Sequence, residues 1–186
     1  MRIACLGWGS LIWNPGTLSV VGGWQADGPS LPVEFARESR DGRITLVICD
    51  GVVSVPTQWA LLNVGDVRAA ISSLAEREGI TKRVNADIGF VDTTTGRSHG
   101  ACASDVETWA LAHDFACVVW ANLPCGFRHS RFVMPSGEDV LAHLRGLDAE
   151  AHGAAREYVE RTPAEVDTSY RRLIVASLGW KPSQTP

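Results

Sequence analysis

A glycine-rich loop follows directly after a short apolar segment at the start of the chain. Residues 2–6 are mostly apolar and fit a buried strand, and the loop after them begins Gly7-Trp8-Gly9-Ser10-Leu11. Gly7 and Gly9 permit backbone turns that a Cβ resists, and they leave room for a ligand beside main-chain N–H groups. Such loops can form anion or oxyanion pockets from those amides. For a bare Gly-x-Gly-Ser motif, however, a tight turn without a ligand is the commoner interpretation.

A carboxylate at the end of a predicted helix is the second candidate for chemistry. The sequence predicts a helix from Asp66, which can act as its N-cap, to Glu78, with Gly79 as the stop. Counting about 100° per residue from Val67, Glu78 returns to within about 20° of the apolar face, whereas Glu76 points to solvent. Burial and the negative end of the helix dipole disfavour the charged carboxylate, as suits a general base or acid. A last-turn Glu that only reaches solvent is the alternative.

Both motifs resemble the γ-glutamylcyclotransferase-like superfamily, most closely its glutathione-specific (cation-transport-regulator-like) branch. Residues 7–15, Gly-Trp-Gly-Ser-Leu-Ile-Trp-Asn-Pro, are similar to the N-terminal Gly-Tyr-Gly-Ser-Leu-Ile-Trp loop of that branch. Residues 74–79 are similar to the family segment whose Arg-Glu pair contains the catalytic glutamate. This resemblance assigns the catalytic role to Glu78, the carboxylate that the helix-face count selects independently.

The sequence departs from the family pattern at two aromatic positions. Trp8 stands where the loop of the family has Tyr, and residues 79–82, Gly-Ile-Thr-Lys, lack the Tyr that often follows the catalytic glutamate. Two phenols of the expected pocket are therefore missing, which bears on the substrate more than on the type of reaction. The resemblance is strongest over residues 3–16 and weaker over residues 31–50 and 71–92.

The resemblance implies an intramolecular reaction that forms 5-oxoproline. In this reaction the α-amine of a γ-glutamyl group attacks its own γ-carbonyl and releases the amine that had been acylated. Glu78 would act as general acid and base, and the loop residues Trp8, Gly9, Ser10 and Leu11 would hold the glutamyl part through backbone N–H groups and the Ser10 hydroxyl. The substrate would be a γ-glutamyl amine or peptide, with glutathione as one candidate. The reaction requires no organic cofactor and no metal.

Two other classes of function remain open. A non-catalytic module on the same fold could bind a small acidic metabolite, and the two missing phenols favour this alternative. A Cys125 thiolate with His129 as its base could instead support a hydrolase, although no orienting acid accompanies that pair. The position of Glu78, and contact between Cys125 and His129, discriminate among the three.

The composition is that of an ordinary globular protein. Hydrophobic residues make up 45% and charged residues 20% of the 186 residues, and the net charge of −4 gives no basic surface for nucleic acid or anionic membranes. No apolar run is long enough to cross a bilayer. Five scattered cysteines favour free thiols in a reducing cytoplasm, and their spacing indicates no zinc site. We expect a cytoplasmic protein without nucleic-acid or membrane partners, and the oligomeric state stays open.

The predicted elements indicate the α+β fold class, because strands dominate the first two thirds of the chain and helices the last third. Strand-like segments occur at residues 2–6, 31–37, 43–49, 57–62, 86–92 and 115–122, with a hairpin turn at Asp41-Gly42. The resemblance implies a compact, mixed, partly closed β-barrel flanked by helices. We expect a single domain over residues 1–180 and a loose tail over residues 181–186.

Capping residues predict where the later helices begin. The predicted starts are a capping box Ser104-x-x-Glu107 for a helix to about His113, Ser136-x-x-Asp139 for a helix toward Leu147, and Thr162-Pro163 for a helix that ends near Gly179. Residues 148–161 are rich in Ala and Glu and are also predicted to be helical.

Overall fold

The computed structural model describes residues 1–183 as two compact units. The first unit comprises Met1–Gly7, Leu11–Ser30 and Pro56–Leu123, and the second comprises Trp8–Ser10, Leu31–Val55 and the chain from Pro124 onward. The chain therefore passes between the units several times. The expectation of one domain over residues 1–180 stays a prediction.

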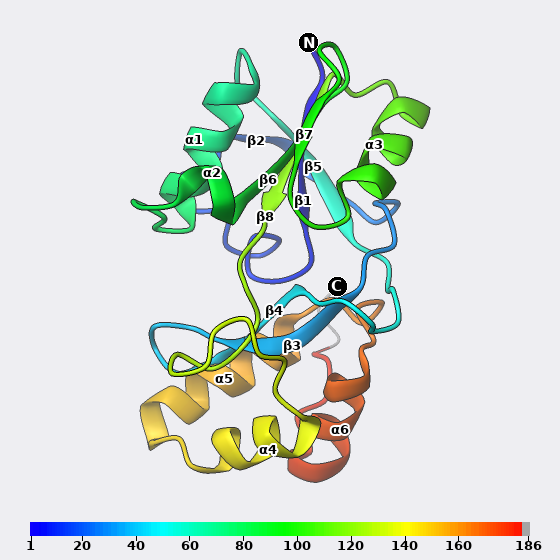
Figure 1. Ribbon diagram of the computed structural model, residues 1–186. Coiled ribbons are helices and arrows are strands. Elements are labelled where there is room, and N and C mark those ends of the chain that lie inside the picture. Colours follow the sequence, from blue (N-terminus) through cyan, green and yellow to red (C-terminus); the bar gives the residue numbers. More distant parts are fainter. Residues whose placement is uncertain (184–186) are drawn as a thin grey trace. The chain divides into compact units, whose positions relative to one another are not determined.

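A six-stranded mixed sheet forms the centre of the first unit (Figure 1). Its strand order is β2-β5-β1-β8-β6-β7. The central β1 pairs antiparallel with β5 and parallel with β8, and β6 pairs antiparallel with β8 and β7. The strands are β1 (Ile3–Gly7), β2 (Val20–Gln25), β5 (Gln58–Leu62), β6 (Ile88–Asp92), β7 (Arg97–His99) and β8 (Cys117–Ala121).

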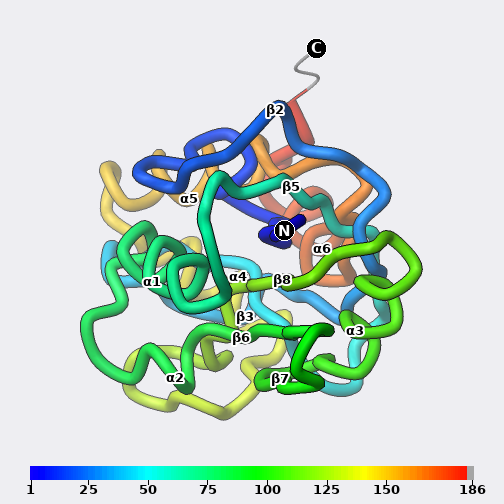
Figure 2. The backbone as a smooth tube through the Cα atoms, turned by 90° about the horizontal axis from the view of Figure 1, so that it is seen from above, coloured from blue at the N-terminus to red at the C-terminus, as the bar shows by residue number. Residues whose placement is uncertain are grey.

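Helices cover both faces of this sheet. Figures 1 and 2 show α1 (Val67–Arg77) and the short α2 (Val84–Asp87) on one face, and α3 (Ala103–Ala112) on the other. Alternate residues of a strand point to opposite faces. Accordingly, Ile3 and Cys5 of β1 are buried in one core cluster with Leu74 of α1. All of β1 is buried, as the apolar run in the sequence predicts.

Both ends of α1 are fixed by local hydrogen bonds, and this confirms the predicted limits of the helix. The Asp66 side chain accepts a 2.8 Å hydrogen bond from the Ala69 amide at the N-terminus. At the other end Gly79 adopts a left-handed φ of +65°. The amides of Gly79 and Ile80 then bond to the carbonyls of Glu76 and Ala75, which is a Schellman motif. Glu78 is consequently the C-cap residue of α1.

The second unit packs a β-hairpin against three helices. Strands β3 (Val33–Glu38) and β4 (Ile44–Ile48) pair antiparallel around the predicted Asp41-Gly42 turn, where Gly42 has a φ of +84°. Helices α4 (Gly137–Arg145), α5 (Ala149–Arg161) and α6 (Ser169–Leu178) lie on one side of the hairpin (Figure 1).

A buried carboxylate anchors α6 to β3. Glu34 is 1% exposed and accepts hydrogen bonds from the Thr168 hydroxyl and from the amides of Phe35 and Tyr170. Two of these donors belong to the N-terminal end of α6, where amide groups lack partners within the helix. Glu34 therefore satisfies the helix end and is not available as a surface charge.

Two of the predicted helix starts are wrong, whereas the Ser136 capping box is confirmed for α4. The N-cap of α3 is Cys102 with a φ of +60°, so the helix begins earlier than Ser104 predicts. Thr162 ends α5 and does not begin the next helix. The buried Arg171 donates to four carbonyls between residues 159 and 166, which holds this stretch as a loop, and α6 starts after Thr168.

Three elements lack a signal in the sequence. Strand β2 contains two adjacent glycines and is mostly exposed, and β7 is three exposed residues long. Residues 86 and 87, predicted as strand, belong to α2, because the left-handed Arg83 starts a short helical turn before β6. The mixed α+β class nevertheless agrees with the prediction.

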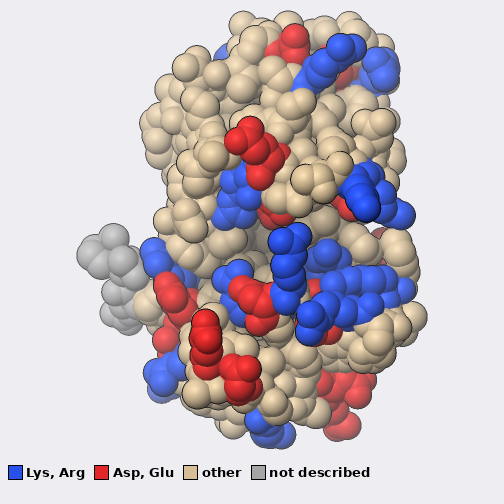
Figure 3. Space-filling view, turned by 90° about the vertical axis from the view of Figure 1, so that its left-hand side faces the viewer, with Lys and Arg blue, Asp and Glu red and all other residues tan. Residues whose placement is uncertain are grey.

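Charged side chains of both signs lie on the face drawn in Figure 3. Figure 3 shows Lys and Arg side chains among Asp and Glu side chains on one face of the molecule. Within residues 1–183, no helix is long and apolar enough to cross a membrane. Ser183 hydrogen-bonds through its amide and hydroxyl to the Glu160 carbonyl, and the rest of the predicted tail, residues 184–186, lies outside the described residues.

Candidate functional site

Glu78 lies on the inward side of the last turn of α1. Its side chain is 16% exposed, whereas Glu76 is an exposed residue. The difference agrees with the helix-face count, which directs Glu78 toward the apolar face. The Schellman motif fixes the backbone of Glu78, so the carboxylate extends from a rigid position.

Arg77 connects Glu78 to the first loop of the chain. Its guanidinium donates to Glu78 Oε1 over 2.7 Å from Nη1 and to the Asn14 carbonyl over 2.6 Å from Nη2. The stem of Arg77 also passes the Asn14-Pro15-Gly16 turn, because a Cβ on Gly16 would lie 3.6 Å from its Cγ. Residues 11–16 and α1 belong to the same unit. The two sequence motifs that carried the resemblance are therefore joined by one side chain.

The charges that act on the Cys5 thiol indicate that the Glu78 carboxylate lies close to strand β1. Burial raises the pKa of the fully buried Cys5 thiol far above its usual range, and the negative charge of Glu78 raises it further, while Arg77 opposes the rise. These electrostatic effects require the Arg77–Glu78 pair to lie near Cys5. Glu78 therefore lies beside the strand that leads directly into the glycine-rich loop.

The first half of the glycine-rich loop is built into the second unit. The Trp8 indole is 6% exposed and its Nε1 donates to the Leu46 carbonyl over 3.2 Å. A Cβ on Gly9 would lie 2.2 Å from the Tyr158 hydroxyl, which itself accepts a hydrogen bond from the Leu46 amide. The absence of a side chain at Gly9 thus makes room for Tyr158.

The two loop glycines do not adopt the unusual backbone angles that the sequence analysis expects of them. Neither Gly7 nor Gly9 has a positive φ. A Cβ on Gly7 would lie 2.6 Å from the Trp24 ring within the first unit, just as a Cβ on Gly9 would overlap Tyr158. Both glycines are therefore required by close packing of an aromatic side chain, and this corrects the turn-based explanation.

The remaining loop residues predicted to bind substrate differ in what they can offer. The Leu11 side chain is 6% exposed and belongs to the core cluster of the first unit, so only its backbone can contact a ligand. Ser10 is half-buried in the second unit. Within residues 1–183, the backbone N–H groups of Gly9 and Leu11 donate no hydrogen bond. Main-chain N–H groups without a partner are donors of the kind that can bind an anion.

Cys125 adjoins another thiol. Burial raises the pKa of the Cys49 thiol to about 12, and the nearby Cys125 contributes to that rise. The His129 ring stacks on Phe127 at a centroid distance of 5.7 Å. In the part of the chain that the structure describes, no hydrogen bond joins Cys125 to His129, so a thiolate–imidazole pair is not assembled.

Sequence reasoning missed the partners of the predicted residues. Arg77 was visible only as part of the family's Arg-Glu pair, and its second contact, the Asn14 carbonyl, is a backbone group without any sequence signal. Tyr158 follows Gly9 by 149 positions, so only the fold brings them together.

Within residues 1–183, no three His, Cys, Asp or Glu side chains converge as a metal site. No family model, curated protein or solved structure matches this chain.

Proposed function

We propose that this protein is a γ-glutamylcyclotransferase-like enzyme that releases 5-oxoproline from a γ-glutamyl amine or peptide. The observation that carries the proposal is the Arg77 bridge between Glu78 and the Asn14 carbonyl. It joins the predicted base to the turn that closes the glycine-rich motif. The Glu78 side chain is only 16% exposed. A Glu78 that extended into solvent would have favoured a purely structural helix end instead.

In the proposed reaction Glu78 moves one proton in each direction. Its carboxylate takes a proton from the α-ammonium group of the substrate, and the freed amine attacks the γ-carbonyl carbon to form the ring C–N bond. The ring nitrogen of the tetrahedral intermediate releases its second proton to solvent, and the original amide C–N bond breaks. Glu78 returns its proton to the departing nitrogen, so the products are 5-oxoproline and the free amine. Arg77 donates to Oε1 of Glu78 and would hold the carboxylate in place during this transfer.

The loop would supply binding and stabilisation of the oxyanion. Trp8, Gly9, Ser10 and Leu11 are proposed to hold the glutamyl part mainly through main-chain N–H groups, because the side chains of Trp8 and Leu11 are buried. Holding the amine against the carbonyl in one molecule lowers the entropic part of the barrier. We further propose that the mixed sheet corresponds to the partly closed barrel of this family.

A non-catalytic binding module is the second candidate. Trp8 replaces the family's loop Tyr, and its indole N–H is already bound to Leu46, so it adds no hydroxyl to a pocket. A module of this kind would bind a γ-glutamyl compound without converting it.

A substrate screen separates the two candidates. The protein is incubated with γ-glutamyl amines and peptides, glutathione included, and 5-oxoproline is quantified by mass spectrometry. Peptides with the same composition but an α-glutamyl linkage are the matched controls. We expect 5-oxoproline from at least one γ-glutamyl compound and none above background from its α-linked control. Binding of a γ-glutamyl compound by calorimetry without any 5-oxoproline would establish the module and reject the enzyme.

A further inference from the structure

A separate pocket of about 620 Å³ lies within the first unit. It is formed by α1, α2, β6 and the edge strand β7, and its lining includes neither Glu78 nor the glycine-rich loop. A cavity of this volume is in the range that binds small organic molecules in proteins. The proposed cyclotransferase mechanism makes no use of it.

The floor of the pocket is apolar and continuous with the core. Ile88 of β6 is 1% exposed, and Ile71 of α1 and Phe90 of β6 pack against the same buried cluster. A floor that belongs to the packed core is preformed, so a ligand does not have to order it. Phe90 offers an aromatic surface for a flat ligand.

The rim of the pocket carries polar side chains that have no partner among the described residues 1–183. His99 lies directly opposite Phe90 in the β6–β7 register, and alternate residues share a face, so Arg97 extends on the same side as His99. Asn85 of α2 completes this rim. Within residues 1–183, the side chains of Arg97, His99 and Asn85 form no hydrogen bond or ion pair. The rim therefore offers one permanent cation and several free hydrogen-bonding groups.

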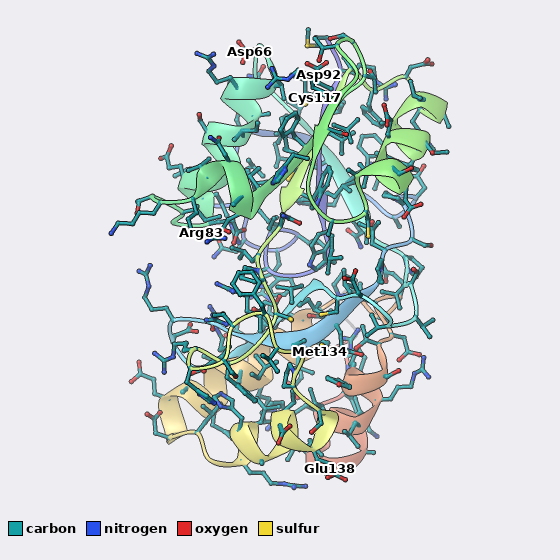
Figure 4. All side chains as sticks on the ribbon, in the orientation of Figure 1. Asp66, Arg83, Asp92, Cys117, Met134 and Glu138 are labelled. Carbon is teal, nitrogen blue, oxygen red and sulfur yellow. The ribbon has the colours of Figure 1, made fainter. Side chains whose placement is uncertain are left out.

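Within residues 1–183, no carboxylate forms an ion pair with Arg97. The lining of the pocket contains no acidic residue. Asp92 lies opposite Arg97 in the register, but its carboxylate accepts hydrogen bonds from Thr94 and Thr95. Figure 4 shows Asp92 near Asp66 and Cys117 at one end of the first unit. On α2, Asp87 is paired with Arg83 at 3.5 Å.

We propose that this pocket binds a small organic carboxylate with a flat apolar body. The carboxylate pairs with the guanidinium of Arg97, which can present two parallel N–H groups to it. His99 and Asn85 donate further hydrogen bonds, and the apolar body covers Phe90, Ile71 and Ile88. The pocket is then a ligand site in addition to the one proposed at Glu78.

Binding of 1-naphthoate to the full-length protein tests this proposal, with the uncharged 1-naphthamide as the matched ligand. Titrations are followed by ¹H–¹⁵N NMR, which locates the bound ligand by its shifts. We expect naphthoate to shift amides of α2, β6 and β7 and to bind about tenfold more tightly than naphthamide, as one charge-assisted hydrogen-bonding pair provides. The variant Arg97→Gln should remove that preference.

Two further variants make the result specific. Arg68→Gln removes one positive charge from an exposed position of α1 outside the pocket lining, so naphthoate should bind it as it binds the wild type. Glu78→Gln should also bind naphthoate normally, because the two sites are distinct. Equal binding of naphthoate and naphthamide, equal loss in Arg97→Gln and Arg68→Gln, or shifts located away from β6 and β7 would each overturn the proposal.

Discussion

Arg77 Nη1 lies 2.7 Å from Glu78 Oε1, and the same guanidinium reaches the carbonyl of Asn14, 63 residues earlier in the chain. The two side chains are only 11% and 16% exposed. An ion pair in such a position is weakly screened, and removal of one partner leaves the other charge poorly compensated. Arg77 is accordingly assigned as a positioning residue for Glu78.

Two substitutions of Arg77 should therefore distinguish its positioning of Glu78 from the effect of its positive charge alone. Arg77→Met should lower kcat by roughly tenfold or more, with a smaller effect on KM, and should reduce the free energy of unfolding by about 2 kcal/mol. Arg77→Lys keeps the charge and should recover part of the stability, but a single ammonium cannot hold both Glu78 and the Asn14 carbonyl in the same geometry. Steady-state kinetics and urea unfolding measure both quantities. Equal kcat values in Arg77→Met and the wild type would exclude the positioning role.

Gly9→Ala should destabilise the second unit. The added methyl would lie 2.2 Å from the Tyr158 hydroxyl and must displace it, which costs roughly 1–3 kcal/mol. Gly23→Ala is the matched control, because no atom lies within 4 Å of a Cβ at that position and its φ is not positive. Thermal denaturation should show a clear decrease in Tm for Gly9→Ala only.

Removal of the Tyr158 hydroxyl tests the cause of that decrease. In the background Tyr158→Phe, the further change Gly9→Ala should cost less than it costs in the wild type, because the closest atom is gone. Identical costs in the two backgrounds would show that the loop backbone, and not Tyr158, excludes a side chain at position 9.

Particular residues show how far the sequence alone could lead. Asp66 and Gly79 carry strong capping signals, and from them the limits of α1 and the inward direction of Glu78 followed correctly. Apolar strands such as β1 were also predicted, because burial on both faces requires continuous hydrophobicity. Strand β7 could not be predicted, since three exposed residues leave no pattern. The partners of Arg77, Gly9 and Glu34 are brought together by the tertiary fold, so no local sequence pattern predicts these contacts.

Glu34 should make stability depend on pH. Burial is the largest effect on the Glu34 carboxyl and raises its pKa above the ordinary value of 4.5, although hydrogen bonds from Thr168 and from backbone amides oppose the rise. A raised pKa in the folded state means that the contribution of Glu34 is fully present below about pH 4.5 and is lost as the pH rises through the folded-state pKa. Glu34→Gln cannot titrate at this position.

Urea unfolding of the wild type and of Glu34→Gln over roughly pH 4 to 7 measures this dependence. The free energy of unfolding of the wild type, relative to that of Glu34→Gln, should decrease as the pH increases. A difference that stays constant, or that increases with pH, would contradict the assignment of a raised pKa to Glu34.

Cys125→Ser should retain most of the 5-oxoproline-forming activity. The proposed mechanism uses a carboxylate base, and Cys125 adjoins Cys49 and not a histidine base. Steady-state kinetics of Cys125→Ser should give kcat within a few-fold of the wild type. A folded Cys125→Ser protein that binds substrate but has no turnover would instead support covalent catalysis by the thiol.

The most direct test of the account compares kcat for 5-oxoproline release in Glu78→Gln and Glu76→Gln. The two substitutions make the same chemical change two residues apart, on the inward and the solvent-facing side of the same helix end. Glu78→Gln should fold, bind the γ-glutamyl substrate and lose about 10²-fold or more in kcat, because the proton acceptor is gone. Glu76→Gln should match the wild type. Equal losses in both variants, or full activity in Glu78→Gln, would contradict the assignment of Glu78 as the general base.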